Sequence, residues 1–188
     1  MVKIPIPPGA FTADVAGRKR WRTDPRLLTA LLGTLPRGAT VVDCGAGGGR
    51  YVAALREYQY RAVGVDGTLD VAMRSGGLVL WVDLSVPCRW DPPADWGICI
   101  EVGEHVPAER AGVFIDNVAA AATDGLIVSW AVPGQRGRNH VNCRPPDWVA
   151  AEFAARGWVV DTVMTPIARS LAGRGWHRKL LIFQRGPT

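Results

Sequence analysis

The fold is decided by residues 40–50, which read TVVDCGAGGGR. The β-branched run predicts a buried strand at about 40–44, and a helical pattern follows the glycines at about 48–57. A buried strand that turns over glycines into the N-terminus of a helix suits a small ligand, because glycines let the backbone approach it closely. We therefore expect a ligand site at this turn.

The spacing of the glycines indicates which kind of ligand. A dinucleotide fingerprint that starts at Gly45 would need Gly or Ala at position 50, where this chain has Arg50. Asp43 is a hydrogen-bond acceptor and suits a ligand with an ammonium group or hydroxyls. The pattern Asp-x-Gly-x-Gly-x-Gly, with further glycines at Gly47 and Gly49, resembles motif I of class I S-adenosylmethionine-dependent methyltransferases. An NAD enzyme is the more distant alternative.

Length and composition predict one globular domain. The chain has 188 residues, 48% of them hydrophobic, and a net charge of +5. We expect an irregular N-terminal arm over 1–24 and a single domain over 25–188. No apolar run approaches the roughly 18 residues of a membrane helix, and prolines interrupt the N-terminus. We therefore expect a cytoplasmic protein with no membrane partner, and the oligomeric state stays open.

Apolar runs alternate with helical patterns along the chain. A first helix starts at Pro25, with Asp24 as its N-cap. Further strands are expected at 61–66, 78–83, 96–101, 126–130, 158–164 and 179–184, and further helices at about 108–122 and 146–156. The alternation predicts a parallel sheet covered on both faces, and a loop alone between the last two strands predicts an antiparallel addition.

This arrangement is similar to the sheet of the class I methyltransferases. The resemblance implies an α/β fold with a doubly wound, mostly parallel, seven-stranded sheet in the order 3-2-1-4-5-7-6. Strand 7 is antiparallel in that fold, and helices lie on both faces.

The resemblance also implies roles for the acidic residues at successive strand ends. Asp43 would lie near the amino-acid part of S-adenosylmethionine, Asp66 would accept the ribose hydroxyls, and Asp83 with Leu84 would meet the adenine. The spacing from Asp43 to Asp66 also suits NAD, and each acid alone could be a helix cap or a solvated turn. The implied cofactor set is Asp43, Gly45, Ala46, Gly47, Gly49, Asp66, Gly67, Asp83, Leu84 and Glu101.

Residues 100–107, IEVGEHVP, resemble the Glu-Val-x-Glu-His-Val segment found after strand 4 in many small-molecule methyltransferases. We expect Glu104, His105 and His140 at the reactive end, where an imidazole can remove a proton from the methyl acceptor. Together with Glu101 they also resemble the metal-binding set of small-RNA 3′-end methyltransferases and some quinone-pathway O-methyltransferases. Three alternatives stay open, namely a divalent metal site, a metal-free acid, base or positioning role, and purely structural contacts.

Three segments are expected to close the substrate pocket, namely 1–24, 131–145 and 165–178. All three carry arginines, which favours a polar or anionic small molecule, although ordinary surface charge is the alternative. The sequence therefore predicts a methyltransferase that modifies O or N of a small polar or acidic substrate. The alternatives are an RNA or nucleotide methyltransferase and a catalytically silent cofactor-binding module.

Overall fold

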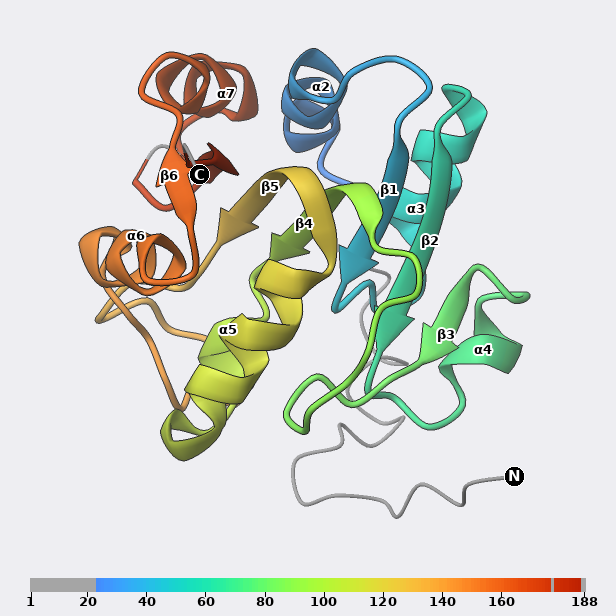
Figure 1. Cartoon of the computed structure of the whole chain (residues 1–188), viewed down its shortest axis with the longest axis horizontal. Coiled ribbons are helices and arrows are strands. Elements are labelled where there is room, and N and C mark those ends of the chain that lie inside the picture. The colour runs from blue at the N-terminus through green and yellow to red at the C-terminus, as the bar shows by residue number, and fades with distance from the viewer. Residues whose placement is uncertain (1–22, 177, 187–188) are drawn as a thin grey trace.

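The structure is a computed structural model that describes residues 23–176 and 178–186. Its elements are α2 (Pro25–Thr34), β1 (Thr40–Cys44), α3 (Arg50–Glu57), β2 (Arg61–Asp66), α4 (Val71–Arg74), β3 (Val79–Trp81), β4 (Ala94–Ile100), the 3₁₀ turns η1 (Gly103–His105) and η2 (Ala108–Arg110), α5 (Ala111–Ala120), β5 (Ala122–Ser129), α6 (Pro146–Ala154), β6 (Trp158–Val160), α7 (Met164–Ala172) and β7 (Leu181–Arg185). Figure 1 shows how the strands cross the centre of the molecule.

The strands form one seven-stranded sheet in the order β3-β2-β1-β4-β5-β7-β6. Strands β1 to β5 pair in parallel, and β7 runs antiparallel to both β5 and β6. Ile127 of β5 lies opposite Ile182 of β7, and Val160 of β6 lies opposite Phe183. The expected fold class and strand order are confirmed.

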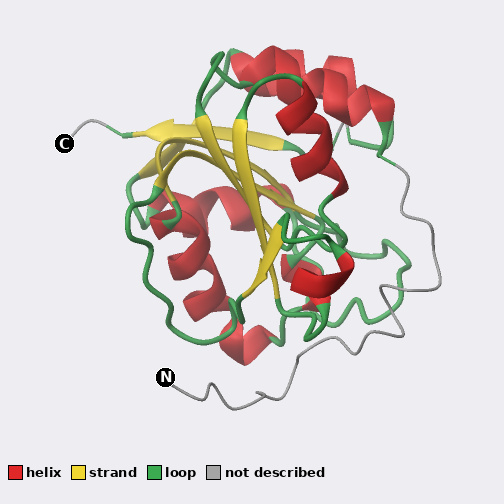
Figure 2. Ribbon diagram, turned by 90° about the vertical axis from the view of Figure 1, so that its right-hand side faces the viewer, coloured by secondary structure: helices red, strands yellow, loops and turns green. Residues whose placement is uncertain are grey.

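Alternating side chains of the strands reach two separate cores. Val41 belongs to the core that includes Leu31 of α2 and residues of α3 and α7. The next residue, Val42, belongs to the core that includes Phe114 of α5 and residues of α6. Successive residues of a strand point to opposite faces, so a sheet with apolar residues on both faces must be covered twice. Figure 2 shows the sheet between these two layers of helices.

The segment between the last two strands differs from the expectation. The predicted strand over 158–164 ends at Val160, and the predicted loop over 165–178 contains helix α7. Pro166 weakens a helical interpretation of the sequence, but it lies in the first turn, where no intrahelical N–H bond is lost. The helix is stabilised by packing, because Ala168 and Ala172 are buried in the core that α2 shares. The prediction of a loop alone is therefore wrong.

Other boundaries shift by a few residues. The helix expected over 108–122 is divided into η2 and the shorter α5, and β5 begins at Ala122 rather than at 126, since Ala122 pairs with Ala94 beyond a register irregularity. Asp24 does cap α2, because its Oδ1 accepts from the backbone N–H groups of Arg26 (2.9 Å) and Leu27 (3.4 Å). Most of the expected arm, residues 1–22, lies outside the described residues. Among the described helices, none is long and apolar enough to cross a bilayer.

Candidate functional site

The loop after β1 depends on glycine in two ways. The φ angles of Gly45, Gly47 and Gly49 are +85°, +53° and +74°, a region that side chains disfavour. A Cβ on Gly45 would lie 2.4 Å from Val102 Cγ2, and a Cβ on Gly49 would lie 2.8 Å from Val79 Cγ2. The loop is therefore packed tightly at Gly45 and Gly49, while a Cβ on Gly47 or Gly48 would meet no atom within 4 Å.

Asp66, the last residue of β2, turns its carboxylate toward this loop. Its Oδ2 accepts from the N–H of Gly47 (2.8 Å), and its Oδ1 accepts from the N–H of Thr68 (2.8 Å). The carbonyl of the next residue, Gly67, accepts from Trp81 Nε1 (3.1 Å). Asp66 thus ends β2, as expected, and its carboxylate holds the glycine loop in place.

Two further acids lie at the same edge of the sheet. Asp43 is buried in β1, and its pKa is raised to about 7 by burial and, to a lesser extent, by the Asp66 carboxylate. Asp83 lies two residues beyond β3, and its Oδ1 accepts from the N–H of Ser85 (2.8 Å). Its Oδ2 is buried and has no hydrogen-bond partner among the described residues. Because a buried acceptor without a donor is costly, this oxygen is suited to a ligand donor.

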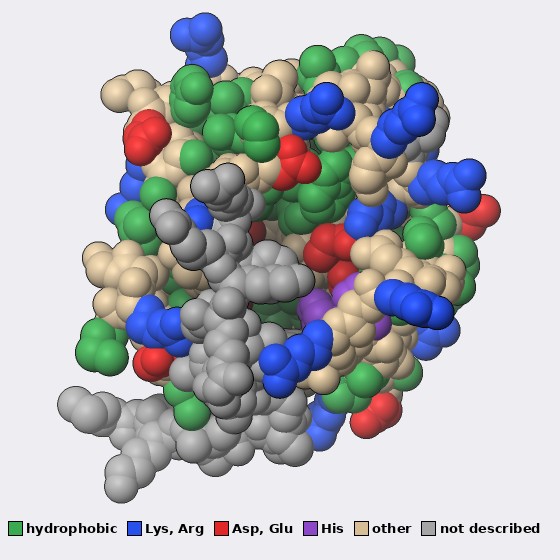
Figure 3. Space-filling model, turned by 180° about the vertical axis from the view of Figure 1, so that it is seen from behind, with side chains coloured by type: hydrophobic (Ala, Val, Ile, Leu, Met, Phe, Trp, Pro, Cys, Tyr) green, Lys and Arg blue, Asp and Glu red, His purple; other side chains and the backbone are tan. Residues whose placement is uncertain are grey.

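The structure brings together the three residues expected at the reactive end. Glu104 and His105 lie in η1, directly after β4, and His140 lies in the connection between β5 and α6. Each residue offers one atom that could bind a metal, and these three atoms lie within 4.8 Å of one another. The two imidazole rings meet edge to face, with their centroids 5.0 Å apart. Figure 3 shows histidine and acidic side chains in a hollow of this face, with lysine and arginine side chains around it.

Backbone carbonyls orient both imidazoles. His105 Nδ1 lies 3.1 Å from the carbonyl oxygen of Asn139, and His140 Nδ1 lies 3.2 Å from that of Gln135. With Nδ1–H as the donor, the neutral ring carries its lone pair on Nε2. Gly137 makes room for this arrangement, because a Cβ there would lie 2.0 Å from Nε2 of His140.

Glu104 is a buried carboxyl group that lacks a close hydrogen-bond donor among the described residues. Its side chain is 0% exposed, and neither oxygen has a hydrogen-bond partner among the described residues. His140 Nε2 lies 4.0 Å from Oε1, beyond hydrogen-bond distance. Burial, and after it the Glu101 carboxylate, raises the pKa of Glu104 to about 7. Burial also lowers the pKa of His105, which favours the neutral imidazole. The buried Glu104 carboxyl group therefore needs either a proton or a bound cation.

Glu101 does not join this cluster. Its Oε1 accepts from Ser129 Oγ (3.0 Å), while Oε2 accepts from Gln135 Nε2 (2.8 Å) and forms an ion pair with Lys179. Its φ of +54° is unusual for a residue with a side chain and typical of functional sites. The structure thus brings together three of the four residues of the expected metal set, while the fourth pairs with a lysine.

Gln135 and Lys179 are site residues that the sequence analysis missed. Lys179 also lies over the ring of Trp176, 4.8 Å from its centroid, and Trp176 Nε1 donates to Asp24 Oδ2 (2.9 Å). Lys179 and Glu101 are 78 residues apart in the chain. A lysine in an arginine-rich connection carries no local signal of such a partner.

The cluster of Glu104, His105 and His140 fits a divalent transition metal. Two imidazoles and one carboxylate form a common donor set for such ions. Histidine ligands usually donate their second ring N–H to a carboxylate or a backbone carbonyl, as both rings can do here. The unsatisfied Glu104 oxygens add a negative charge that a metal would neutralise.

Comparisons with known proteins give matches among solved structures alone. No family model matches the chain, and no curated protein matches it. The magnesium protoporphyrin IX methyltransferase of Synechocystis PCC 6803, solved with bound S-adenosylhomocysteine, superimposes with a TM-score of 0.65 over 87% of this chain and 82% of its own, at 19% identity. The chain has the class I methyltransferase fold.

Two other solved structures with this fold belong to enzymes that carry out different reactions. The 1,6-didemethyltoxoflavin-N1-methyltransferase of Burkholderia thailandensis is 22% identical, with a TM-score of 0.60 over 91% of this chain and 83% of its own. The [4+2]-cyclase SpnF is 14% identical, with a TM-score of 0.62 over 92% and 84%. Since proteins with this fold carry out different reactions, the function of a class I methyltransferase fold has to be argued from its site.

Proposed function

We propose that this chain is an S-adenosylmethionine-dependent methyltransferase that modifies O or N of a small polar or acidic molecule. The observation that carries the proposal is the glycine loop with three positive φ angles, faced by the carboxylate of Asp66. It lies at the carboxyl end of β1, beside β4, where chain connections diverge and where open α/β sheets bind ligands. The Synechocystis and Burkholderia enzymes were both solved with S-adenosylhomocysteine.

The acids at the sheet edge match the polar groups of this cofactor. Asp66 would accept the ribose hydroxyls, and Asp43 would lie near the ammonium group. Asp83 Oδ2, which lacks a donor among the described residues, would accept the adenine amino group, with Leu84 beside the ring. Gly45, Ala46, Gly47, Gly49, Gly67 and Glu101 complete the proposed cofactor set.

S-adenosylmethionine supplies a methyl group that its sulfonium already activates. The protein then has to hold the acceptor in line and take up its proton. His105 is suited to that task because its lowered pKa keeps the ring neutral and the Asn139 carbonyl holds it in place. His140 and Glu104 would position the acceptor or share its proton, since His140 Nε2 lies 4.0 Å from Glu104 Oε1.

Calorimetry with S-adenosylhomocysteine and with NAD tests the cofactor. The wild type should bind the former and not the latter. Asp83→Asn should weaken binding about tenfold or more, because the amide would turn a donor toward the adenine amino group. Asp91→Asn is the matched control, since that side chain is 78% exposed. Unchanged affinity in Asp83→Asn would contradict the adenine assignment, and tight NAD binding would contradict the proposed function.

A divalent metal that assists the transfer is the second candidate, favoured by the buried, unsatisfied carboxylate of Glu104 between two imidazoles. Glu104, His105 and His140 would hold it, and it would lower the pKa of a bound acceptor hydroxyl. Titration with Mn²⁺ should show a site that Glu104→Gln abolishes and that Glu109→Gln, an exposed control, retains. No binding to the wild type would leave the metal-free role of the histidines.

A further inference from the structure

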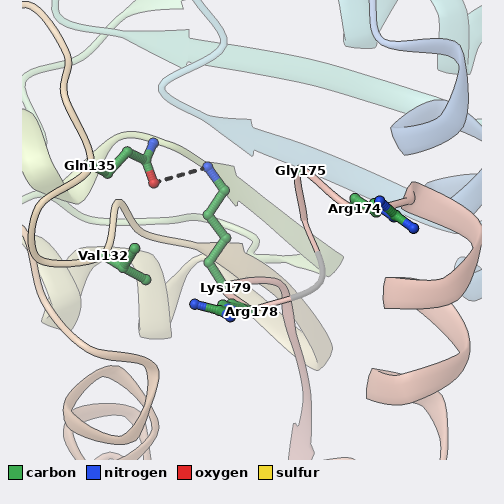
Figure 4. Close-up of a pocket in the computed structure, with 6 residues that line it drawn as sticks. All are labelled: Val132, Gln135, Arg174, Gly175, Arg178 and Lys179. Carbon is green, nitrogen blue, oxygen red and sulfur yellow. Dashed lines mark hydrogen bonds between the residues drawn. The ribbon is translucent and has the colours of Figure 1, made fainter.

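A cavity of about 490 Å³ opens at the surface, and its lining does not include Glu104, His105 or His140. It is lined by Val132, Gln135, Arg174, Gly175, Arg178 and Lys179 (Figure 4). The lining comes from two connections, one between β5 and α6 and the other between α7 and β7. The volume falls within the range of about 300–1,000 Å³ that is usual for small-molecule sites.

Gln135 joins this cavity to the reactive end. Its backbone carbonyl contacts His140 Nδ1 (3.2 Å), while its side chain donates to Glu101 (2.8 Å) and accepts from Lys179 (3.3 Å). The dashed line in Figure 4 marks the contact with Lys179. A molecule in the cavity would therefore contact the residue whose backbone carbonyl holds the His140 imidazole.

The lining carries three cationic side chains and no acidic one. Glu101 neutralises Lys179, but Arg174 and Arg178 form no ion pair with any residue between 23 and 176 or between 178 and 186. Lys179 gives two donors to Glu101 and Gln135, and an ammonium group has three. The cavity is therefore positively charged and offers unused donors.

We propose that this cavity binds an anionic group of the methyl acceptor, either a carboxylate or a phosphate monoester. The guanidinium groups of Arg174 and Arg178 bind it, because their fork of N–H donors matches the oxygens of both groups. Lys179 is a positioning residue, held by Glu101 and Trp176 at the inner wall. The anion then orients the rest of the molecule toward His140. This inference rests on the proposed methyl transfer to a small molecule.

Calorimetry at constant ionic strength tests this proposal with three probes of similar size, namely phenyl phosphate, benzoate and neutral benzyl alcohol. The wild type should bind at least one anionic probe and not the alcohol. Arg174→Gln and Arg178→Gln should each weaken that binding about tenfold or more. Arg37→Gln is the matched control, since Arg37 is exposed and lies before β1, at the opposite end of the strands. The tighter anion identifies the carboxylate or the phosphate.

Failure of both anionic probes to bind would overturn the inference, whether or not a single-stranded oligonucleotide binds. Equal binding of the neutral probe, or equal weakening by Arg37→Gln, would overturn it as well. Titration of the same samples with S-adenosylhomocysteine separates this inference from the function on which it rests. If S-adenosylhomocysteine binds and the anions do not, only the anion site is wrong. If S-adenosylhomocysteine does not bind, the proposed function is wrong.

Discussion

Replacing Glu104 by glutamine should change how the stability of the protein depends on pH. Burial raises the pKa of this carboxyl group from 4.5 to about 7, and no described donor satisfies it. The folded protein therefore keeps a proton that the unfolded chain releases, so stability falls as pH rises from 4.5 to about 7 and the loss is complete above that. At about 1.36 kcal/mol per pKa unit the whole effect is about 3 kcal/mol.

Urea unfolding in the presence of EDTA measures this effect. Between pH 5 and pH 8 the wild type should lose about 2–3 kcal/mol more stability than Glu104→Gln, whose amide does not titrate. Glu109→Gln should behave as the wild type, because Glu109 is exposed. If the stability of the wild type and of Glu104→Gln changes with pH in parallel, the interpretation of Glu104 as a buried, unsatisfied carboxyl group is refuted. If the metal alternative is correct, Mn²⁺ should restore the stability of the wild type at pH 8 and leave the stability of Glu104→Gln unchanged.

Three further variants test other parts of the structure by denaturant unfolding. Gly49→Ala should destabilise by about 1–3 kcal/mol, because its φ is +74° and its Cβ would clash, whereas Gly48→Ala meets no atom within 4 Å and should be nearly neutral. Asp24→Ala should cost about 1–2 kcal/mol, because α2 loses its cap and Trp176 Nε1 loses its acceptor. Lys179→Met should cost about 1–3 kcal/mol, and the double variant with Glu101→Gln should recover part of that loss; full additivity would contradict the ion pair.

The sheet and the edge that carries the candidate site could be predicted because their signals are local. The glycines after β1 and Asp66 after β2 each lie within a few residues of the strand that positions them. Glu104 and His105 likewise follow β4 directly. Parallel strands place all these residues at one edge, so strand assignment was enough to group them.

The remaining features depend on contacts between distant segments. Helix α7 is short and contains Pro166, and it was missed because its stability comes from burial against α2. The pairing of Glu101 with Lys179 follows from the position of the α7–β7 connection over β4, which no pattern near either residue indicates. Of the four residues expected to bind a metal, three consequently lie together, and the fourth, Glu101, forms an ion pair with Lys179.

The insertion of β7 between β5 and β6 has a consequence for how the protein is made. Strands β1 to β5 precede it in the chain and can associate as a growing polypeptide leaves the ribosome. Among the described strands, however, β6 pairs with β7 alone, so it has no neighbour until 181–185 emerges. Lys179, just ahead of β7, reaches Glu101 in the same late stage. The nascent chain would thus form the glycine loop before the lining of the cavity is complete, so the proposed cofactor edge would form before the proposed acceptor pocket.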